Sequence, residues 1–217
     1  MSPGRDVRAV FADLTSESAR NNFIAEVSAI CDSPDIFVAA AGLDLMSKAA
    51  KQLTFEERFA RLWQLDVVAT MQLARYFGQR MQQTRREHKA KHNTVAGSQA
   101  TSGQGAIVLF GWDGVESGMT GETAQLYAAA KGAIHGFARS FGKNIAPEVR
   151  VNCVAPGWIK TTWGETASAE TGERVAAESL AQRWGTAEEA AELVCFLVSD
   201  AASYINNQVI CVNGGRM

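Results

Sequence analysis

The amino-acid sequence predicts an α/β protein built on a parallel sheet with helices on both faces. Segments with strand character and segments with helix character alternate along the 217 residues, which is the order of a parallel sheet with crossover helices. The strand segments are continuous apolar runs, as expected for strands that are buried on both faces. Ligands of such sheets bind beyond the carboxyl ends of the strands, so residues at those ends are the first candidates for a functional site.

Each predicted strand is a short apolar run bounded by small or turn-forming residues. The runs cover residues 7–11, 35–42, 106–110, 149–154 and 208–212. Asp13 follows the first run, Gly42 ends the second, and Pro156 and Gly157 follow the fourth. We therefore expect these residues at one edge of the sheet.

The intervening segments have the patterns of helices. Helices are predicted over residues 16–29, 54–86, 123–145 and 186–199. The first has Thr15 or Ser16 as its cap, and Thr54 and Thr186 each open a capping box with a glutamate three residues later. The helix over 123–145 has an apolar stripe at helical spacing and must end before Pro147.

Composition excludes several classes of function. The net charge of −2 argues against a general nucleic-acid or membrane partner. No apolar run reaches the length of a membrane span and the start does not resemble a signal peptide, so we expect a cytoplasmic protein. The four cysteines and three histidines have no metal-ligand spacing, so we expect buried, reduced thiols and no metal site.

The end of the second predicted helix is strongly basic. Glu87 is the one acid among residues 75–91. The basic residues there are Arg75, Arg80, Arg85, Arg86, Lys89 and Lys91. A solvated helix end is a better interpretation than a binding patch, because positive charge also suits the helix dipole. Residues 92–104 are small and polar and predict a flexible surface loop inside a single domain that covers residues 1–217.

The pentapeptide YAAAK carries the clearest chemical signal. Tyr127 and Lys131 are four residues apart on the predicted helix, so their side chains share a face. An ammonium beside a phenol favours the phenolate, and we expect it to lower the tyrosine pKa from its usual value of about 10. Such a phenol suits general acid–base chemistry near neutral pH. For the pentapeptide alone, a chance spacing on an ordinary helix is the favoured alternative.

The flanking sequence reverses that preference. YAAAK resembles the Tyr-x-x-x-Lys motif of the short-chain dehydrogenase/reductase family, particularly its ketoacyl-reductase-like members. Other stretches resemble further family motifs in the same order: the turn 13–15, the stretch 40–42, the Pro-Gly turn and threonine of 156–161, and the C-terminal signature of 183–205 and 209–215. The resemblance runs from about residue 7 to the C-terminus.

This resemblance implies a three-layer, Rossmann-like, doubly wound parallel sheet. It also implies an oxidoreductase that transfers a hydride between NAD or NADP and a small carbonyl or secondary-alcohol substrate. Tyr127 would be the proton donor or acceptor, and Lys131 would lower its pKa and hold the ribose. The implied cofactor-binding residues are Asp13, Ala40, Ala41, Gly42, Tyr127, Lys131, Pro156, Gly157, Ile159 and Thr161.

The largest departure from the family pattern is at the start. The chain opens where the family's third strand should begin, so the expected fold is truncated and lacks the first two strands. The missing glycine-rich turn is the part that binds the pyrophosphate through backbone N–H groups, and the choice between NAD and NADP cannot be read. An internal start codon within a longer protein is one explanation. We expect residues 7–11 to move in beside residues 36–39 as an ordinary βαβ unit.

Two further departures affect the proposed chemistry. The position of the family's catalytic serine is Trp112 when counted from the strand, or Gly114 when counted back from Tyr127. Neither offers a hydroxyl, although the Trp112 N–H or Asp113 could partly substitute, and Ser117 and Thr120 are alternative stand-ins further along the loop. Asp66 stands where the family has an asparagine in its proton relay, and an acid there could still hold a water.

Two functions remain open from the sequence. Tyr127, Lys131 and the Pro-Gly turn favour an oxidoreductase, whereas the missing glycine-rich turn and serine favour a catalytically degenerate relative that serves as a binding protein or oligomeric subunit. The resemblance implies a homodimer or homotetramer. Its contact would be built by the 123–145 helix and the basic helix, with small residues that allow close approach: Ala128, Ala129, Gly132 and Gly136.

Overall fold

The computed structural model describes residues 6–91, 103–165 and 167–216. Its helices are α1 (Glu17–Ile30), α2 (Phe55–Leu62), the π-helical η2 (Trp63–Ala69), α3 (Thr70–Lys91), α4 (Gly114–Ser117), α5 (Glu122–Ile145), α6 (Thr162–Glu165), α7 (Ala169–Ala177) and α8 (Ala187–Val198), with short 3-10 turns η1 (Ala50–Gln52) and η3 (Asp200–Ala202). Its strands are β1 (Ile36–Ala39), β2 (Gly105–Phe110), β3 (Val149–Pro156) and β4 (Val209–Val212). Most of the loop predicted at 92–104 lies outside the described residues.

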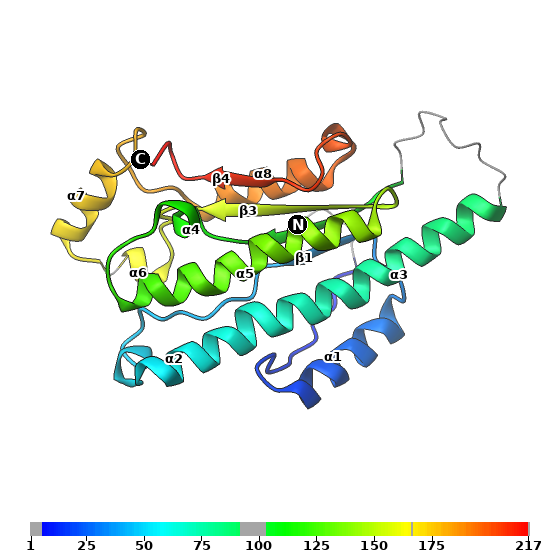
Figure 1. Ribbon diagram of the computed structural model, residues 1–217, viewed down its shortest axis with the longest axis horizontal. Coiled ribbons are helices and arrows are strands. Elements are labelled where there is room, and N and C mark those ends of the chain that lie inside the picture. Colours follow the sequence, from blue (N-terminus) through cyan, green and yellow to red (C-terminus); the bar gives the residue numbers. More distant parts are fainter. Residues whose placement is uncertain (1–5, 92–102, 166, 217) are drawn as a thin grey trace.

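The four strands form one parallel sheet in the order β1-β2-β3-β4. Along the middle of the sheet Val38 pairs with Val108, and Val108 pairs with Asn152. The carboxyl ends of all the strands therefore meet at one edge, at the left of Figure 1. The predicted α/β class with a parallel sheet is confirmed.

Helices cover both faces of the sheet, with α3 and α5 on one face and α8 on the other (Figure 1). Ile107 and Leu109 of β2 pack into the core under α3 and α5. Val108, between them, packs with Leu197 of α8 in a separate cluster on the opposite face. Both sides of the strand are thus buried, which explains its uninterrupted apolar sequence.

Helix α1 lies along the outer side of α3 and is held there mainly by polar contacts (Figure 1). The buried Arg20 donates from Nε to Gln72 Oε1 at 2.8 Å and from Nη1 to the Leu14 carbonyl at 2.8 Å. The Ser28 and Tyr76 hydroxyls are hydrogen-bonded at 3.1 Å. Ser16 caps the helix, as one of the two predicted alternatives.

The prediction of a strand at residues 7–11 is wrong. This segment has no regular structure, and Val7 and Phe11 are 85% and 93% exposed. The predicted pairing with residues 36–39 is also wrong, since the sheet ends at β1. A short apolar run becomes a strand only when a neighbouring strand pairs with its backbone, and residues 7–11 form no such pairing.

The basic end of α3 ties the helix to its neighbours. Arg80 pairs with Asp32, and Arg85 pairs with Asp35 at 2.8 Å. Arg86 and Lys89 both reach the buried Glu148, at 3.2 and 3.5 Å. Much of this charge is therefore used in ion pairs within the fold. Across the described ranges, no helix is both long and apolar enough to cross a membrane.

Candidate functional site

Tyr127 and Lys131 lie one turn apart on α5, and Lys131 reaches the carboxyl end of β2. The Lys131 side chain is 10% exposed and its Nζ lies 2.7 Å from Oδ2 of Asp66. Lys131 Nζ also donates to the Phe110 carbonyl at 3.3 Å, at the end of β2. The lysine is thus fixed between the sheet edge and the neighbouring helical segment.

Asp66 reaches this position from η2, the π-helical stretch between α2 and α3. Inserted turns of this kind change the direction of a helix face and are frequent at functional sites. The Asp66 side chain is 1% exposed, and its Oδ1 accepts from the Leu43 backbone N–H at 2.9 Å. A Cβ added at Gly42 would lie only 3.3 Å from Oδ2. The loop after β1 therefore packs directly on this carboxylate.

The Tyr127 hydroxyl stands at the end of a chain of polar contacts that leads to Lys131. It donates to the Leu43 carbonyl at 2.5 Å. The same Leu43 residue donates its N–H to Asp66, which pairs with Lys131. Tyr127 and Lys131 are thus connected through one residue of the β1 loop and one carboxylate. We call Tyr127, Leu43, Asp66 and Lys131 the phenol cluster.

The expectation that Lys131 lowers the pKa of Tyr127 is wrong for this arrangement. Burial raises the pKa of Tyr127 to about 12, and the negative charges of Asp66 and Asp44 act in the same direction. A backbone hydrogen bond from Leu45 opposes them only in part. The lysine is not available to stabilise a phenolate because its charge is matched by Asp66 at 2.7 Å.

Trp112, one of the two positions predicted for the serine, stands beside the phenol. Its ring centroid lies 6.3 Å from that of Tyr127, with the planes tilted by 52°. The backbone N–H of Trp112 faces Nε2 of His135 at 3.4 Å. His135 is 5% exposed and lies one helical turn beyond Lys131. Burial, together with Arg139 and Lys131, lowers the pKa of His135 and favours its neutral form, with Glu116 opposing in part.

Sequence reasoning missed His135 as a component of the site. The signal was present, because residues 127, 131 and 135 repeat at four-residue spacing along one face of a helix. His135 also packs tightly against the end of β2: a Cβ at Gly111 would lie 2.1 Å from its Nε2. Glycine at position 111 is therefore what allows the imidazole to reach the backbone.

A second group of charges lies over the ends of β2 and β3. Asp113 Oδ1 pairs with Arg216 Nη1 at 2.9 Å, and these side chains are 3% and 9% exposed. Arg216 Nε also lies 3.4 Å from Glu178, whose other contacts include the Trp158 indole N–H at 2.8 Å. Asn213 donates to Asp113 at 3.2 Å. We call Asp113, Arg216, Glu178 and Trp158 the tail cluster, because it ties the C-terminal segment to α7 and the β2 loop.

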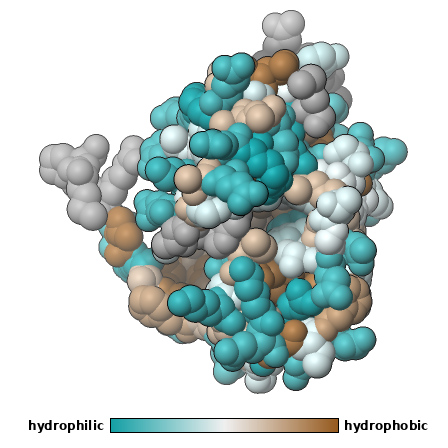
Figure 2. Space-filling view, turned by 90° about the vertical axis from the view of Figure 1, so that its left-hand side faces the viewer, coloured by the Kyte–Doolittle hydropathy of each residue, from teal (hydrophilic) through white to brown (hydrophobic). Residues whose placement is uncertain are grey.

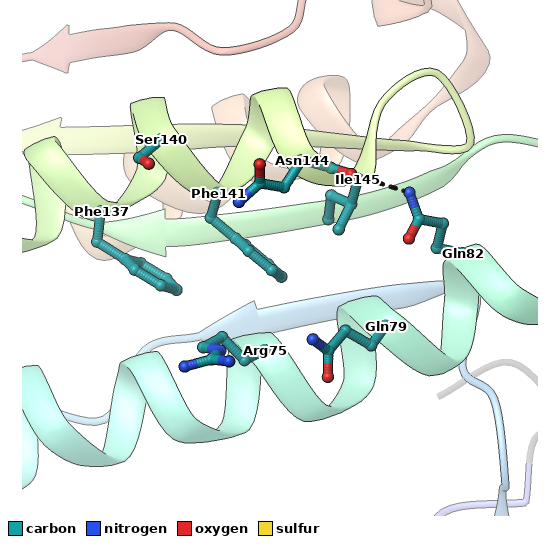
Figure 3. A pocket seen from close by; sticks show the side chains of 8 residues that line it. All are labelled: Arg75, Gln79, Gln82, Phe137, Ser140, Phe141, Asn144 and Ile145. Carbon is teal, nitrogen blue, oxygen red and sulfur yellow. Dashed lines mark hydrogen bonds between the residues drawn. The ribbon is translucent and has the colours of Figure 1, made fainter.

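Figure 2 looks onto the strand-end edge of the molecule and shows hydrophilic side chains interspersed with hydrophobic ones. A cavity of about 100 Å³ lies beside the tail cluster, with Trp158, Arg183, Glu189 and Asn213 in its lining. A larger groove of about 430 Å³ runs between α3 and α5 (Figure 3). Neither is lined by Tyr127. Among the described residues, no cluster of His, Cys, Asp and Glu could hold a metal ion.

Comparison with known proteins decides the family. A family model described as Enoyl-(Acyl carrier protein) reductase matches residues 2–216. The chain belongs to the short-chain dehydrogenase/reductase family. Within this family it is 42% identical to a 3-oxoacyl-(acyl-carrier-protein) reductase of Aquifex aeolicus over 100 residues, which are 45% of this chain and 40% of the relative. It is 26% identical over 218 residues to Tropinone reductase-like 3 of Erythroxylum coca, covering 98% of this chain and 74% of that protein.

Solved structures of short-chain dehydrogenases/reductases share the fold. A 4-hydroxyisoleucine dehydrogenase complexed with NADH matches with a TM-score of 0.72 at 21% identity, covering 94% of this chain and 76% of that one. A glucose/ribitol dehydrogenase of Brucella melitensis matches with a TM-score of 0.71 at 23% identity, covering 94% and 74%. The alignments with the first bacterial relatives, including the Aquifex reductase, span less than half of the relatives' own length.

Most residues that the family resemblance singled out lie at the strand-end edge of this short-chain dehydrogenase/reductase. Ala40, Ala41 and Gly42 directly follow β1 and lead to Leu43. Pro156 ends β3, and the Gly157 N–H donates to the Val212 carbonyl at 2.9 Å.

Three of the expected cofactor residues make contacts of their own. Ile159 is bridged to Gly185, and its carbonyl accepts from the Thr161 N–H at 2.9 Å. Asp13 instead forms a local turn, accepting from the N–H and hydroxyl of Thr15 at 2.9 and 2.7 Å. Those two bonds lower the pKa of the exposed Asp13.

Proposed function

We propose that this short-chain dehydrogenase/reductase is an oxidoreductase that uses NAD or NADP to interconvert a carbonyl and a secondary alcohol, with Tyr127 as the proton donor. The observation that carries the proposal is the phenol cluster. It holds a hydroxyl and an ammonium one helical turn apart at the strand ends, where ligands of parallel sheets bind.

The residues at the strand ends fit the nicotinamide half of such a cofactor. A Cβ at Gly157 would lie 2.6 Å from that of Asn213, so only glycine leaves the Pro-Gly turn open there. Pro156, Gly157, Ile159 and Thr161 would hold the carboxamide and Lys131 the ribose, as the family resemblance implies. When bound, the cofactor supplies the hydride. Residues 1–217 contain no glycine-rich turn of the kind that binds a pyrophosphate through backbone N–H groups. The fit to the cofactor is therefore argued for its nicotinamide half alone.

The chain's own chemistry is a single proton transfer. As the carbonyl carbon is reduced, the O–H bond of Tyr127 would break and its proton would move to the carbonyl oxygen, giving the alcohol and leaving a phenolate that solvent would reprotonate. The substrate oxygen must replace the Leu43 carbonyl as hydrogen-bond acceptor. Without the serine, Trp112 beside the phenol is the candidate second donor.

A direct binding titration tests the proposal. NADH and NADPH are added separately to the purified chain while the fluorescence of its five tryptophans is followed. We expect saturable quenching with one of the two, because Trp112 and Trp158 lie near the strand ends. Gly157→Val should lose this binding, since its side chain would meet Asn213. If neither cofactor binds at millimolar concentration, the oxidoreductase proposal fails for this chain.

The second candidate function is that of a catalytically degenerate relative that serves as a binding protein or oligomeric subunit. The specific observation in its favour is Trp112 in place of a hydroxyl-bearing residue. Loss of one preorganised donor costs on the order of 10²–10³ in rate in other enzymes. Folded protein that binds neither cofactor would favour this candidate.

Self-association through α3 and α5 is part of the proposal. The groove between these helices (Figure 3) is lined by Phe137 and Phe141, with Arg75, Gln79 and Asn144 around them. On α5, a Cβ at Gly136 would contact no atom within 4 Å, so this helix leaves room for a close partner. Light scattering should show a homodimer or homotetramer, and a monomer at micromolar concentration would contradict this.

A further inference from the structure

The two carboxylate oxygens of Asp66 contact different members of the phenol cluster. Oδ1 accepts from the Leu43 N–H at 2.9 Å, and Oδ2 faces the Lys131 ammonium at 2.7 Å. At 1% exposure, water does not screen these contacts as it screens a surface pair. A neutral asparagine could accept or donate a hydrogen bond here, but it could not balance the charge of the lysine.

The charge balance around Tyr127 follows from this geometry. From η2, Asp66 contributes one negative charge, and from the loop after β1, Asp44 contributes another. From α5 itself, Lys131 contributes one positive charge, which is paired with Asp66. Opposite charges 2.7 Å apart act on a neighbour nearly as a dipole, so their combined field falls off much faster than that of a free ammonium.

The same carboxylate fixes the acceptor of the phenol. The Leu43 peptide is held at its N–H by Asp66, and its carbonyl accepts the Tyr127 hydroxyl at 2.5 Å. A phenolate would face this carbonyl oxygen without a proton between them, which is unfavourable in a buried site. The protonated phenol therefore suits this buried position better than the phenolate.

We infer that Asp66 is a positioning residue that withholds the charge of Lys131 from Tyr127 and orients the Leu43 carbonyl, so that the site holds Tyr127 as a proton donor. This inference rests on the proposed function and adds the direction in which the reaction is favoured, which is carbonyl reduction. Carbonyl reduction needs the protonated phenol and proceeds at neutral pH, whereas alcohol oxidation needs the phenolate and requires alkaline solution. The raised pKa of Tyr127, about 12, agrees with this geometry.

The test measures the ionisation of Tyr127 directly and needs no cofactor. Tyrosine labelled with carbon-13 at Cζ is incorporated into the full chain, whose three tyrosines are assigned with Tyr127→Phe, and the Cζ resonances are followed with pH by NMR. We expect Tyr127 to remain protonated at about pH 10 in the native chain. Asp66→Asn should lower its pKa by about one unit or more, because Lys131 then acts on the phenol unopposed.

Asp44→Asn is the matched control, since it removes an equal charge, from the loop after β1, without freeing the lysine. Its effect on the Tyr127 pKa should be the smaller of the two. An Asp66→Asn titration that is unchanged or shifted upward would overturn the inference, as would a native Tyr127 that ionises below about pH 10. If Asp66→Asn does not fold, the pH at which Tyr127 ionises in the native chain still tests the inference. Failure of cofactor binding would refute the proposed function and leave this titration unaffected.

Discussion

The phenol cluster and the tail cluster are both built around a buried ion pair, but the groups beside the two pairs differ. Each places a buried carboxylate against a cation at the strand-end edge, Asp66 with Lys131 and Asp113 with Arg216. In the first, the ion pair adjoins a hydroxyl that can give up its proton. In the second, the pair leads to further charges and an indole, and it joins segments 103 residues apart in the chain. The difference between the two ion pairs is therefore the phenol beside the first, which is the group proposed to donate a proton.

The largest expected difference between the clusters is in turnover. Tyr127→Phe removes the proton donor and one hydrogen bond to Leu43, so carbonyl reduction should fall by about 10²–10⁴-fold. The free energy of unfolding should change by only about 1 kcal/mol. Steady-state kinetics and circular dichroism of the same preparations measure both. A variant with native turnover would remove Tyr127 from the reaction.

Breaking the tail cluster should mainly affect stability. Arg216→Met leaves the buried Asp113 unpaired and should cost about 3 kcal/mol in urea unfolding. Arg183→Met is the matched control, because its pair with Glu189 is about half exposed and solvent screening should leave it with a much smaller contribution. Equal losses of unfolding free energy in the two variants would show that burial does not make the Asp113–Arg216 pair more stabilising than the Arg183–Glu189 pair.

The tail cluster also predicts a pH dependence. Burial raises the pKa of Asp113, and Arg216 opposes that rise. Without Arg216 the folded-state pKa should lie still higher above the unfolded value, so protonation favours the folded state. The stability deficit of Arg216→Met should therefore shrink as pH falls from neutral toward about 4. A deficit that stays constant over this range in urea unfolding would contradict the assignment.

A smaller effect concerns the packing behind the phenol cluster. Gly111→Ala would place a methyl group 2.1 Å from His135 Nε2 and should cost about 1–3 kcal/mol, measured by thermal unfolding. Gly172→Ala, in α7, meets nothing within 4 Å and should instead stabilise the chain by up to about 1 kcal/mol. A tolerated Gly111→Ala would mean that His135 is not held against the end of β2.

The smallest effect lies outside both clusters, at the start of α8. Thr186→Ala removes one half of a capping box and should cost about 1 kcal/mol. Arg183 and the Thr186 N–H lower the pKa of Glu189 from 4.5 to about 2. Because the folded-state pKa is depressed, this stabilisation is present above about pH 4.5 and lost as pH falls toward 2. Glu189→Gln should remove that part of the acid transition seen by circular dichroism.

Local patterns allowed much of this fold to be predicted. The apolar runs at β2 and β3, the capping boxes at Thr54 and Thr186, and the helix that carries YAAAK were all readable, because their causes lie within a few residues. The run at residues 7–11 was misread, since a strand depends on a distant partner that the local sequence does not contain.

The residues of the candidate site could be predicted from the sequence better than its electrostatics could. Spacing placed Tyr127 and Lys131 on one face, but it could not show that η2 brings Asp66 within 2.7 Å of the lysine. Nor could it show the burial that raises the phenol pKa instead of lowering it. The Asp113–Arg216 pair was likewise beyond reach, because only the folded sheet brings the two residues together.

The central claim is that this chain supplies a proton from Tyr127 while a nicotinamide delivers hydride. Its most direct test is the reduction of a ketone with deuterium on the transferring carbon of NADH or NADPH. The account predicts deuterium at the new carbinol carbon with the native chain, and its loss in Tyr127→Phe. A cofactor that binds to the native chain but transfers no deuterium to any carbonyl substrate would contradict it.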